Sequence, residues 1–160
     1  MEDTLFSQKV KRPLADRLRP QNLSEVVGQD HVVGPDAPLG RMVKSGKITS
    51  FILWGPPGCG KTTLLRDLAR NFSWHHIKVG ICDERSELAG MYQSRPSFDL
   101  GPSCDVLDRC EKTAGIQMLI RSMSPQVIFT DEIGREQDAA AIEDCLNAGI
   151  SLITSMHGNC

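Results

Sequence analysis

Several features that would place the chain in a membrane or on nucleic acid are missing from its 160 residues. It has no run of about 18 apolar residues, so we expect no transmembrane helix. Its first residues, Met-Glu-Asp-Thr-Leu-Phe, are acidic and lack a signal-peptide pattern. The formal net charge is −2, so no general basic field attracts nucleic acid. We therefore expect a cytoplasmic protein of about one domain.

The cysteines form no recognisable metal or disulfide pattern. No C-x-x-C pair and no Cys/His group with zinc spacing is present, so we expect reduced thiols throughout. Cys59 differs from the others because it precedes a predicted helix N-terminus, where a thiolate is stabilised and reactive. The six cysteines are Cys59, Cys82, Cys104, Cys110, Cys145 and Cys160.

Basic residues concentrate in the first third of the chain. They are consistent with a DNA-facing patch or, more commonly, with a solvated surface. These residues are Lys9, Lys11, Arg12, Arg17, Arg19, Arg41, Lys44 and Lys47.

The stretch Gly55–Thr62 fits G-x-x-x-x-G-K-[ST], the P-loop that cradles nucleotide phosphates. The apolar run Ser50–Trp54 before it is typical of a buried parallel strand, and Thr62–Ala69 after it has the leucine spacing of a helix. This order argues against the alternative of a chance glycine-rich loop. We expect Lys61 to reach the β- and γ-phosphates of ATP and the Thr62 hydroxyl to bind Mg²⁺. The predicted phosphate site comprises Gly55, Pro56, Pro57, Gly58, Cys59, Gly60, Lys61, Thr62 and Thr63.

Val127–Glu132 is an apolar run that ends in two acids, the form of a Walker B strand. Asp131 is the expected Mg²⁺ ligand, and Glu132 is the group expected to activate the attacking water. Thr130 departs mildly from the pattern, because that position is usually apolar. A core strand followed by a solvated acidic turn is the alternative, which the P-loop disfavours.

Strands that alternate with helices predict an α/β fold with a mainly parallel sheet, the three-layer sandwich of P-loop NTPases. We expect four core strands and an irregular, functional or mobile stretch at residues 92–112. Trp54 and Trp74 are interpreted as packing residues. The expected strands are Ser50–Trp54, His76–Cys82, Val127–Glu132 and Ser151–Met156. The expected helices are Ser24–Val27, Leu39–Lys44, Thr62–Asn71, Thr113–Met123 and Arg135–Asn147, the last with Ala139, Ala140, Ile142 and Leu146 toward the core.

Several blocks of sequence from the P-loop onward resemble those of a known protein family. They are Pro57–Leu68, Val79–Glu87, Gly101 with Asp105–Asp108, Leu119–Pro125, Asp131–Glu136 and His157-Gly158. In these blocks, across residues 57–160, the chain resembles the stage III sporulation protein AA family, ATPases of the sporulation channel similar to secretion and pilus motors. The resemblance implies ATP and Mg²⁺ as cofactors, a homo-oligomer, and membrane-complex partners on the cytoplasmic face.

The part before the loop has other blocks, Pro13–Pro20, Val27–His31, Pro38–Met42 and Phe51–Pro57. In these the chain resembles the replication-associated recombination protein A family, clamp-loader-like AAA+ ATPases of stalled replication forks. That resemblance implies that residues 19–29 pack around the adenine and that DNA is a partner.

The P-loop is common to both patterns, so the chain looks like a chimera joined at Gly55–Thr63. We expect an AAA+-like segment at residues 1–49, disordered over residues 1–12. A P-loop core at residues 50–160 follows, and we expect it to be incomplete after its fourth strand.

The resemblance to secretion-type ATPases makes Glu84 a second candidate for water activation. The alternative is that Asp83–Arg85 is a solvated loop in which Asp83 pairs with Arg85. His157 resembles the family's histidine element and is a candidate to sense the γ-phosphate, although a histidine at a strand end is more often structural.

Arg121 and Arg135 are candidates for phosphate contact, within the chain or across a subunit interface. The alternative for both is an ordinary surface position.

Three functions remain open on this reading. The first is an oligomeric, Mg²⁺-dependent ATPase motor on a membrane complex, and the second is an AAA+ ATPase that acts with DNA. The third is a nucleotide-binding module with little hydrolysis.

Overall fold

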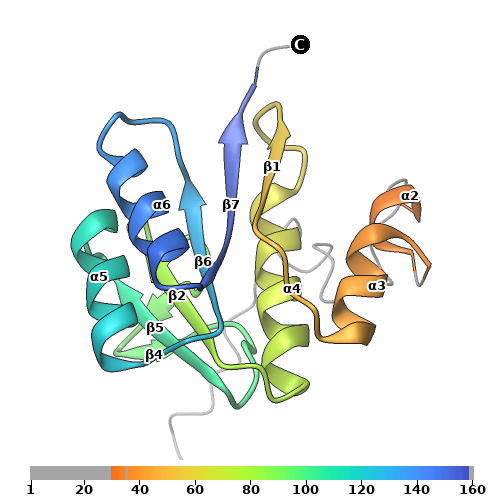
Figure 1. Ribbon diagram of the computed structural model, residues 1–160, viewed down its shortest axis with the longest axis horizontal. Helices are drawn as coiled ribbons and strands as arrows, with labels where there is room; N and C mark the ends of the chain where they lie inside the picture. The colour runs from red at the N-terminus through yellow and green to blue at the C-terminus, as the bar shows by residue number, and fades with distance from the viewer. Residues whose placement is uncertain (1–29, 35, 159–160) are drawn as a thin grey trace, which may run out of the picture.

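The computed structural model describes residues 30–34 and 36–158. The expected loose segment at residues 1–12, the Pro13–Pro20 block, the helix expected at Ser24–Val27 and Cys160 lie outside the described residues. Figure 1 shows one central sheet with helices on both faces. Its five strands are all parallel, in the order β1-β7-β6-β2-β5. The predicted α/β sandwich is therefore confirmed.

The sheet strands are β1 (Phe51–Gly55), β2 (Val79–Asp83), β5 (Cys104–Asp108), β6 (Val127–Glu132) and β7 (Ser151–His157). A separate antiparallel hairpin consists of β3 (Met91–Tyr92) and β4 (Arg95–Pro96). The helices are α2 (Asp30–Val33), α3 (Pro38–Ser45), α4 (Lys61–Trp74), α5 (Lys112–Ser122) and α6 (Asp138–Asn147).

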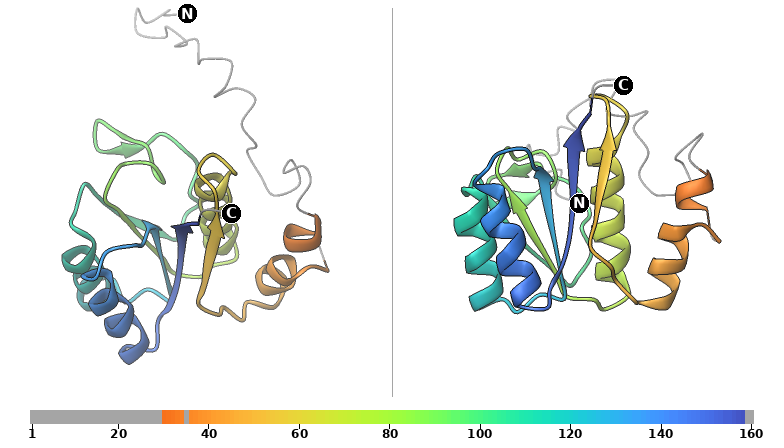
Figure 2. Two further views of the ribbon diagram at one scale, coloured as in Figure 1. Left: turned by 90° about the horizontal axis from the view of Figure 1, so that it is seen from above. Right: turned by 45° about the horizontal axis from the view of Figure 1, so that its top comes forward.

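Helix α4 covers one face of the sheet, and α5 and α6 cover the other (Figure 2). On the α4 face, Phe72 packs against Phe129 of β6, with ring centroids 6.1 Å apart. On the other face, Ile116 and Leu119 of α5 are fully buried. Because β6 is covered on both faces, its sequence is a nearly continuous apolar run up to the acids at its end.

The parallel arrangement brings the carboxyl ends of all the strands to one edge of the sheet. Their last residues are Gly55, Asp83, Asp108, Glu132 and His157. We call this row the carboxyl edge. Sites in α/β sheets form at such edges.

The prediction of an irregular stretch at residues 92–112 is wrong, and so is the prediction of four core strands. This stretch contains β4 and the sheet strand β5, which pairs in parallel with β2. The strand predicted at Ser151–Met156 is therefore the fifth in chain order. Strand β5 was not predicted because its sequence contains Asp105 and Asp108 and follows a Gly-Pro-Ser sequence typical of a loop. Such charged residues are tolerated because β5 is an edge strand.

Helix α6 begins at Asp138, three residues later than predicted. The Asp138 carboxylate accepts hydrogen bonds from the backbone N–H groups of Gly134 (2.8 Å) and Arg135 (2.9 Å) and so holds these residues in a turn. Of the residues predicted to face the core, Ile142 packs against a buried apolar cluster, whereas Ala139, Ala140 and Leu146 are exposed. The buried residues of the helix are Asp138, Ala141 and Cys145.

Two further predictions are wrong. Strand β2 begins at Val79, because His76 adopts a turn conformation with φ 61°. Trp54 and Trp74 are 62% and 56% exposed, so neither is a core packing residue.

Candidate nucleotide-binding site

The P-loop joins the end of β1 to the start of α4. Gly58 and Gly60 have φ values of 79° and 88°, in the left-handed region that other residues rarely adopt. Helix α4 begins directly after this turn, at Lys61. Its first turn leaves backbone N–H groups without helical partners at the positive end of the helix dipole, an arrangement that suits a phosphate group.

The ammonium group of Lys61 lies against the loop itself. Its Nζ donates to the carbonyl oxygens of Gly55 (2.6 Å) and Pro56 (2.8 Å). It also lies 3.5 Å from Nδ1 of His157 and 3.7 Å from Sγ of Cys59, an exposed free thiol. A phosphate on the loop therefore finds this cation beside it.

Glu132 is the last residue of β6, and its carboxylate has a histidine and an arginine as neighbours. Its Oε2 lies 3.0 Å from Nε2 of His157 and 3.6 Å from Nη1 of Arg85. Because the Lys61 ammonium can only donate, Nδ1 of His157 accepts and Nε2–H donates to Glu132. His157 therefore connects the P-loop lysine to the Walker B glutamate.

Asp131 is buried, and burial raises the pKa of its carboxyl, although the Lys112 ammonium opposes this shift. Its Oδ1 lies 3.5 Å from Lys112 Nζ, whereas Oδ2 is buried without a hydrogen-bond partner. A buried carboxylate oxygen without a partner fits a hard cation, which binds oxygen ligands. Asp131 and the predicted ligand Thr62 line the same cavity, so these residues fit Mg²⁺.

Eight of the predicted site residues meet at one cavity of about 790 Å³, within the size range of ligand pockets, whereas Gly55, Pro56, Pro57 and Cys59 of the P-loop are not among the residues that line it. It extends along the carboxyl edge from the P-loop to β6 and β7. The predicted residues that line it are Gly58, Gly60, Lys61, Thr62, Thr63, Asp131, Glu132 and His157.

Glu84 is not among the residues that line the cavity. Its Oε1 lies 3.1 Å from Arg135 Nη1, and its Oε2 lies 3.9 Å from Lys112 Nζ. The alternative of a solvated loop in which Asp83 pairs with Arg85 is wrong, because Asp83 is buried and Arg85 pairs with Glu132. The buried Asp83 carboxylate accepts from the backbone N–H groups of Glu87, Leu88 and Ala89, at 2.9, 3.0 and 2.8 Å.

The candidate arginines differ in position. Arg121 is exposed in the last turn of α5, at the opposite end of that helix from the carboxyl edge, and Arg135 pairs with Glu84. Arg85 lines the cavity, although it belongs to no motif that predicted a role there. Its place three residues after the predicted strand His76–Cys82 was a usable signal, because such residues lie at the carboxyl edge.

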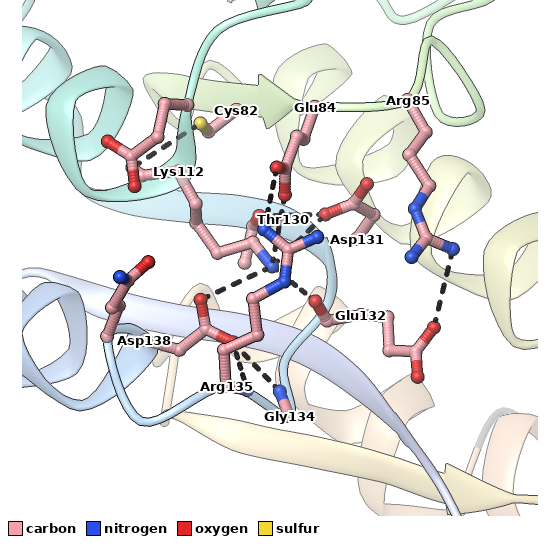
Figure 3. Close-up of polar contacts among 12 residues, drawn as sticks. Cys82, Glu84, Arg85, Lys112, Thr130, Asp131, Glu132, Gly134, Arg135 and Asp138 are labelled. Carbon is pink, nitrogen blue, oxygen red and sulfur yellow. Dashed lines mark hydrogen bonds and ion pairs between the residues drawn. The ribbon is translucent and has the colours of Figure 1, made fainter.

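Lys112 was missed altogether. It is buried at the start of α5, with its ammonium among the side chains that end β2 and β6 (Figure 3). A cation in the first turn of a helix opposes the helix dipole. This unfavourable position was not visible in the sequence, because the predicted helix began one residue later, at Thr113.

Comparison with known families supports both resemblances. The family described as "Sporulation stage III, protein AA" matches residues 24–160, which begins well before the P-loop. Stage III sporulation protein AA of Bacillus subtilis (strain 168) is 51% identical over 112 residues, 67% of this chain and 36% of that protein. Replication-associated recombination protein A of Coxiella burnetii is 39% identical over 121 residues, 76% of this chain and 22% of that protein. The chain thus spans about a third or less of these relatives.

Two solved structures share the fold. The VirB11 ATPase from the Brucella suis type IV secretion system, in complex with sulphate, has a TM-score of 0.56 at 22% identity, covering 76% of this chain and 34% of that one. The Legionella pneumophila ATPase DotB has a TM-score of 0.52 at 19% identity, covering 75% and 34%. At these identities the likeness concerns the fold, which is that of P-loop ATPases.

Proposed function

The chain belongs to the sporulation stage III protein AA family, and we propose that its carboxyl-edge cavity binds ATP with Mg²⁺ and hydrolyses the terminal phosphate. One observation carries this proposal. Residues of the P-loop, Asp131 and Glu132 all line one cavity of about 790 Å³, and Oδ2 of Asp131 is buried without a hydrogen-bond partner. That set can bind phosphate, a cation and a water molecule side by side.

Each residue has a defined part in this proposal. The P-loop N–H groups bind the phosphates, and the Lys61 ammonium exchanges its carbonyl partners for phosphate oxygens. Mg²⁺, when bound by Thr62 and Asp131, neutralises phosphate charge. Glu132 takes a proton from the water that attacks the γ-phosphorus, and the bond to ADP breaks. His157 holds the Glu132 carboxylate through its Nε2–H, 3.0 Å away, and Glu84 is a reserve base outside the cavity.

We further propose that the chain acts as a homo-oligomer at the cytoplasmic face of a membrane complex. The family assignment and the fold shared with an ATPase of a type IV secretion system support this role. None of the helices at residues 30–34 and 36–158 is both long enough and apolar enough to span a bilayer.

Steady-state phosphate release by the wild type and by Glu132→Gln tests the chemistry. We expect slow turnover by the chain alone, because Arg85 is paired with Glu132 and a transition-state arginine contributes about 10³–10⁵ in rate. Glu132→Gln should lower the remaining rate by about 10²–10⁴, the usual contribution of a general base, with little change in ATP affinity. Equal rates for the two proteins would contradict the role of Glu132. Wild-type turnover of several per second would contradict the expectation that no arginine is available to the transition state in the chain alone.

A further inference from the structure

Lys112 is a buried cation, only 4% exposed, with oxygen atoms of four residues around its ammonium (Figure 3). Its Nζ donates to the backbone carbonyl of Glu132. It lies 3.5 Å from Oδ1 of Asp131 and 3.7 Å from Oδ1 of Asp138. A third carboxylate, Oε2 of Glu84, is 3.9 Å away. One ammonium group therefore contacts the ends of β2 and β6 and the start of α6.

This arrangement needs a cation at its centre. The side chains of Asp131 and Asp138 are 7% and 8% exposed, so water screens their charges poorly. Removing one partner from a buried ion pair is strongly destabilising, because it leaves an uncompensated charge. Lys112 thus keeps several carboxylates together at the edge of the cavity.

The two oxygens of Asp131 have different surroundings. Oδ1 faces Lys112, and the Thr130 hydroxyl lies 3.4 Å from it. Oδ2 is buried and has no hydrogen-bond partner. A carboxylate held through one oxygen has little freedom to rotate, so the contact with Lys112 also fixes the direction of the other oxygen.

Taking the proposed ATPase function as its basis, we infer that Lys112 is a positioning residue for Mg²⁺. It holds Oδ1 of Asp131 and thereby presents Oδ2 to the cation that accompanies ATP. Partners that orient a metal ligand from behind typically contribute 10–100-fold in metal affinity.

Simple charge repulsion makes the opposite prediction. A cation beside a metal-binding carboxylate repels Mg²⁺, so if Lys112 acted only through its charge, its removal would tighten Mg²⁺ binding. The direction of the change in Mg²⁺ affinity therefore separates positioning from repulsion.

The test is a Mg²⁺ titration of mant-ATP binding by the wild type and by Lys112→Met, with a second titration of mant-ATP in EDTA. We expect the Mg²⁺ concentration that gives half-maximal enhancement of mant-ATP binding to be about 10–100-fold higher for Lys112→Met than for the wild type. Affinity in EDTA should stay within about threefold, because the P-loop does not contact Lys112. The matched control is Lys78→Met, an exposed lysine that also donates to a backbone carbonyl, that of Met123 at 2.8 Å. It should leave both titrations unchanged.

A second variant keeps the test decisive if Lys112→Met does not fold. Lys112→Met with Asp138→Asn removes the cation together with one carboxylate that it balances, and Asp138→Asn alone is its reference. A weaker response to Mg²⁺ in the double variant supports the inference. Unchanged or tighter Mg²⁺ dependence, or an equal loss with and without Mg²⁺, overturns it. If wild type binds no mant-ATP at all, the proposed function itself has failed.

Discussion

Asp131 and Glu132 are adjacent on β6, yet their carboxylates lie in different surroundings. Asp131 is buried beside Lys112, whereas Glu132 is part-exposed between His157 and Arg85. Neighbouring acids with separated environments can take separate roles: cation binding for Asp131 and water activation for Glu132.

At this scale, the sequence could predict the residues that belong to local motifs. Lys61, Thr62, Asp131 and Glu132 were predicted because the P-loop and the Walker B strand have a fixed spacing. Lys112 and Arg85 have no such spacing. They reach the site because α5 begins and β2 ends at the carboxyl edge, which depends on strand order.

Asp131 should cost the folded protein stability at neutral pH. Burial raises its pKa, so the folded state binds more protons than the unfolded state just above the ordinary aspartate pKa. The free energy of unfolding therefore falls as pH rises through that window. Lys112 keeps Asp138 and Glu84 as partners when Asp131 is neutralised, so no charge is left unpaired. We therefore expect Asp131→Asn to stabilise the protein at pH 7 by roughly 0.5–2 kcal/mol, as stabilising single substitutions do, and to flatten its acid pH dependence. Urea unfolding from pH 4 to 7 measures both.

Asp99→Asn is the control with the opposite sign. A hydrogen bond from Arg70 is the main cause that lowers the pKa of Asp99. Its contribution is present above the ordinary aspartate pKa and lost in acid, so this variant should be slightly less stable at pH 7. If Asp131→Asn also lost stability at pH 7, the ionised Asp131 would be stabilising and its predicted cost would be wrong.

At the scale of elements, the start of α5 determines where Lys112 lies. The Glu111 carboxylate accepts from the N–H groups of Ala114 (2.8 Å) and Thr113 (3.1 Å), contacts that lower its pKa and cap the helix. The predicted start at Thr113 was one residue late. Strand β5, just before, could not be predicted, because its half-buried residues lack a clear apolar alternation.

Close packing of α5 on β2 gives a prediction for Gly115. A Cβ there would lie 2.6 Å from Sγ of Cys82 and 3.2 Å from Sγ of Cys110. We expect Gly115→Ala to destabilise the protein by about 1–3 kcal/mol, as overpacking does. The higher helix propensity of alanine offsets up to about 1 kcal/mol of this loss. Chemical denaturation measures the change.

Gly134→Ala is the matched control, since no heavy atom lies within 4 Å of its Cβ position. It should change stability by less than about 0.5 kcal/mol. If Gly115→Ala were as stable as this control, α5 would not be packed on β2 as closely as described.

At the scale of the whole molecule, the parts on either side of the P-loop form one body. Strand β1, which directly precedes the P-loop, pairs in register with β7, with Phe51 opposite Ile153. Leu39 and Val43 of α3 share a buried cluster with Phe72 of α4. The alternating pattern predicted a parallel α/β sheet, but the strand order was not predictable, because it depends on pairings between distant residues such as these.

The central claim is that the P-loop cavity binds ATP with Mg²⁺ through Lys61. Thermal unfolding of the wild type and of Lys61→Ala, with and without Mg²⁺·ATP, tests it most directly. At ATP about a hundredfold above Kd, the wild type should gain roughly 2.7 kcal/mol, whereas Lys61→Ala, folded and equally stable without nucleotide, should gain almost nothing. An absence of any shift in folded wild type at millimolar ATP would contradict the account, and so would an equal shift in both proteins.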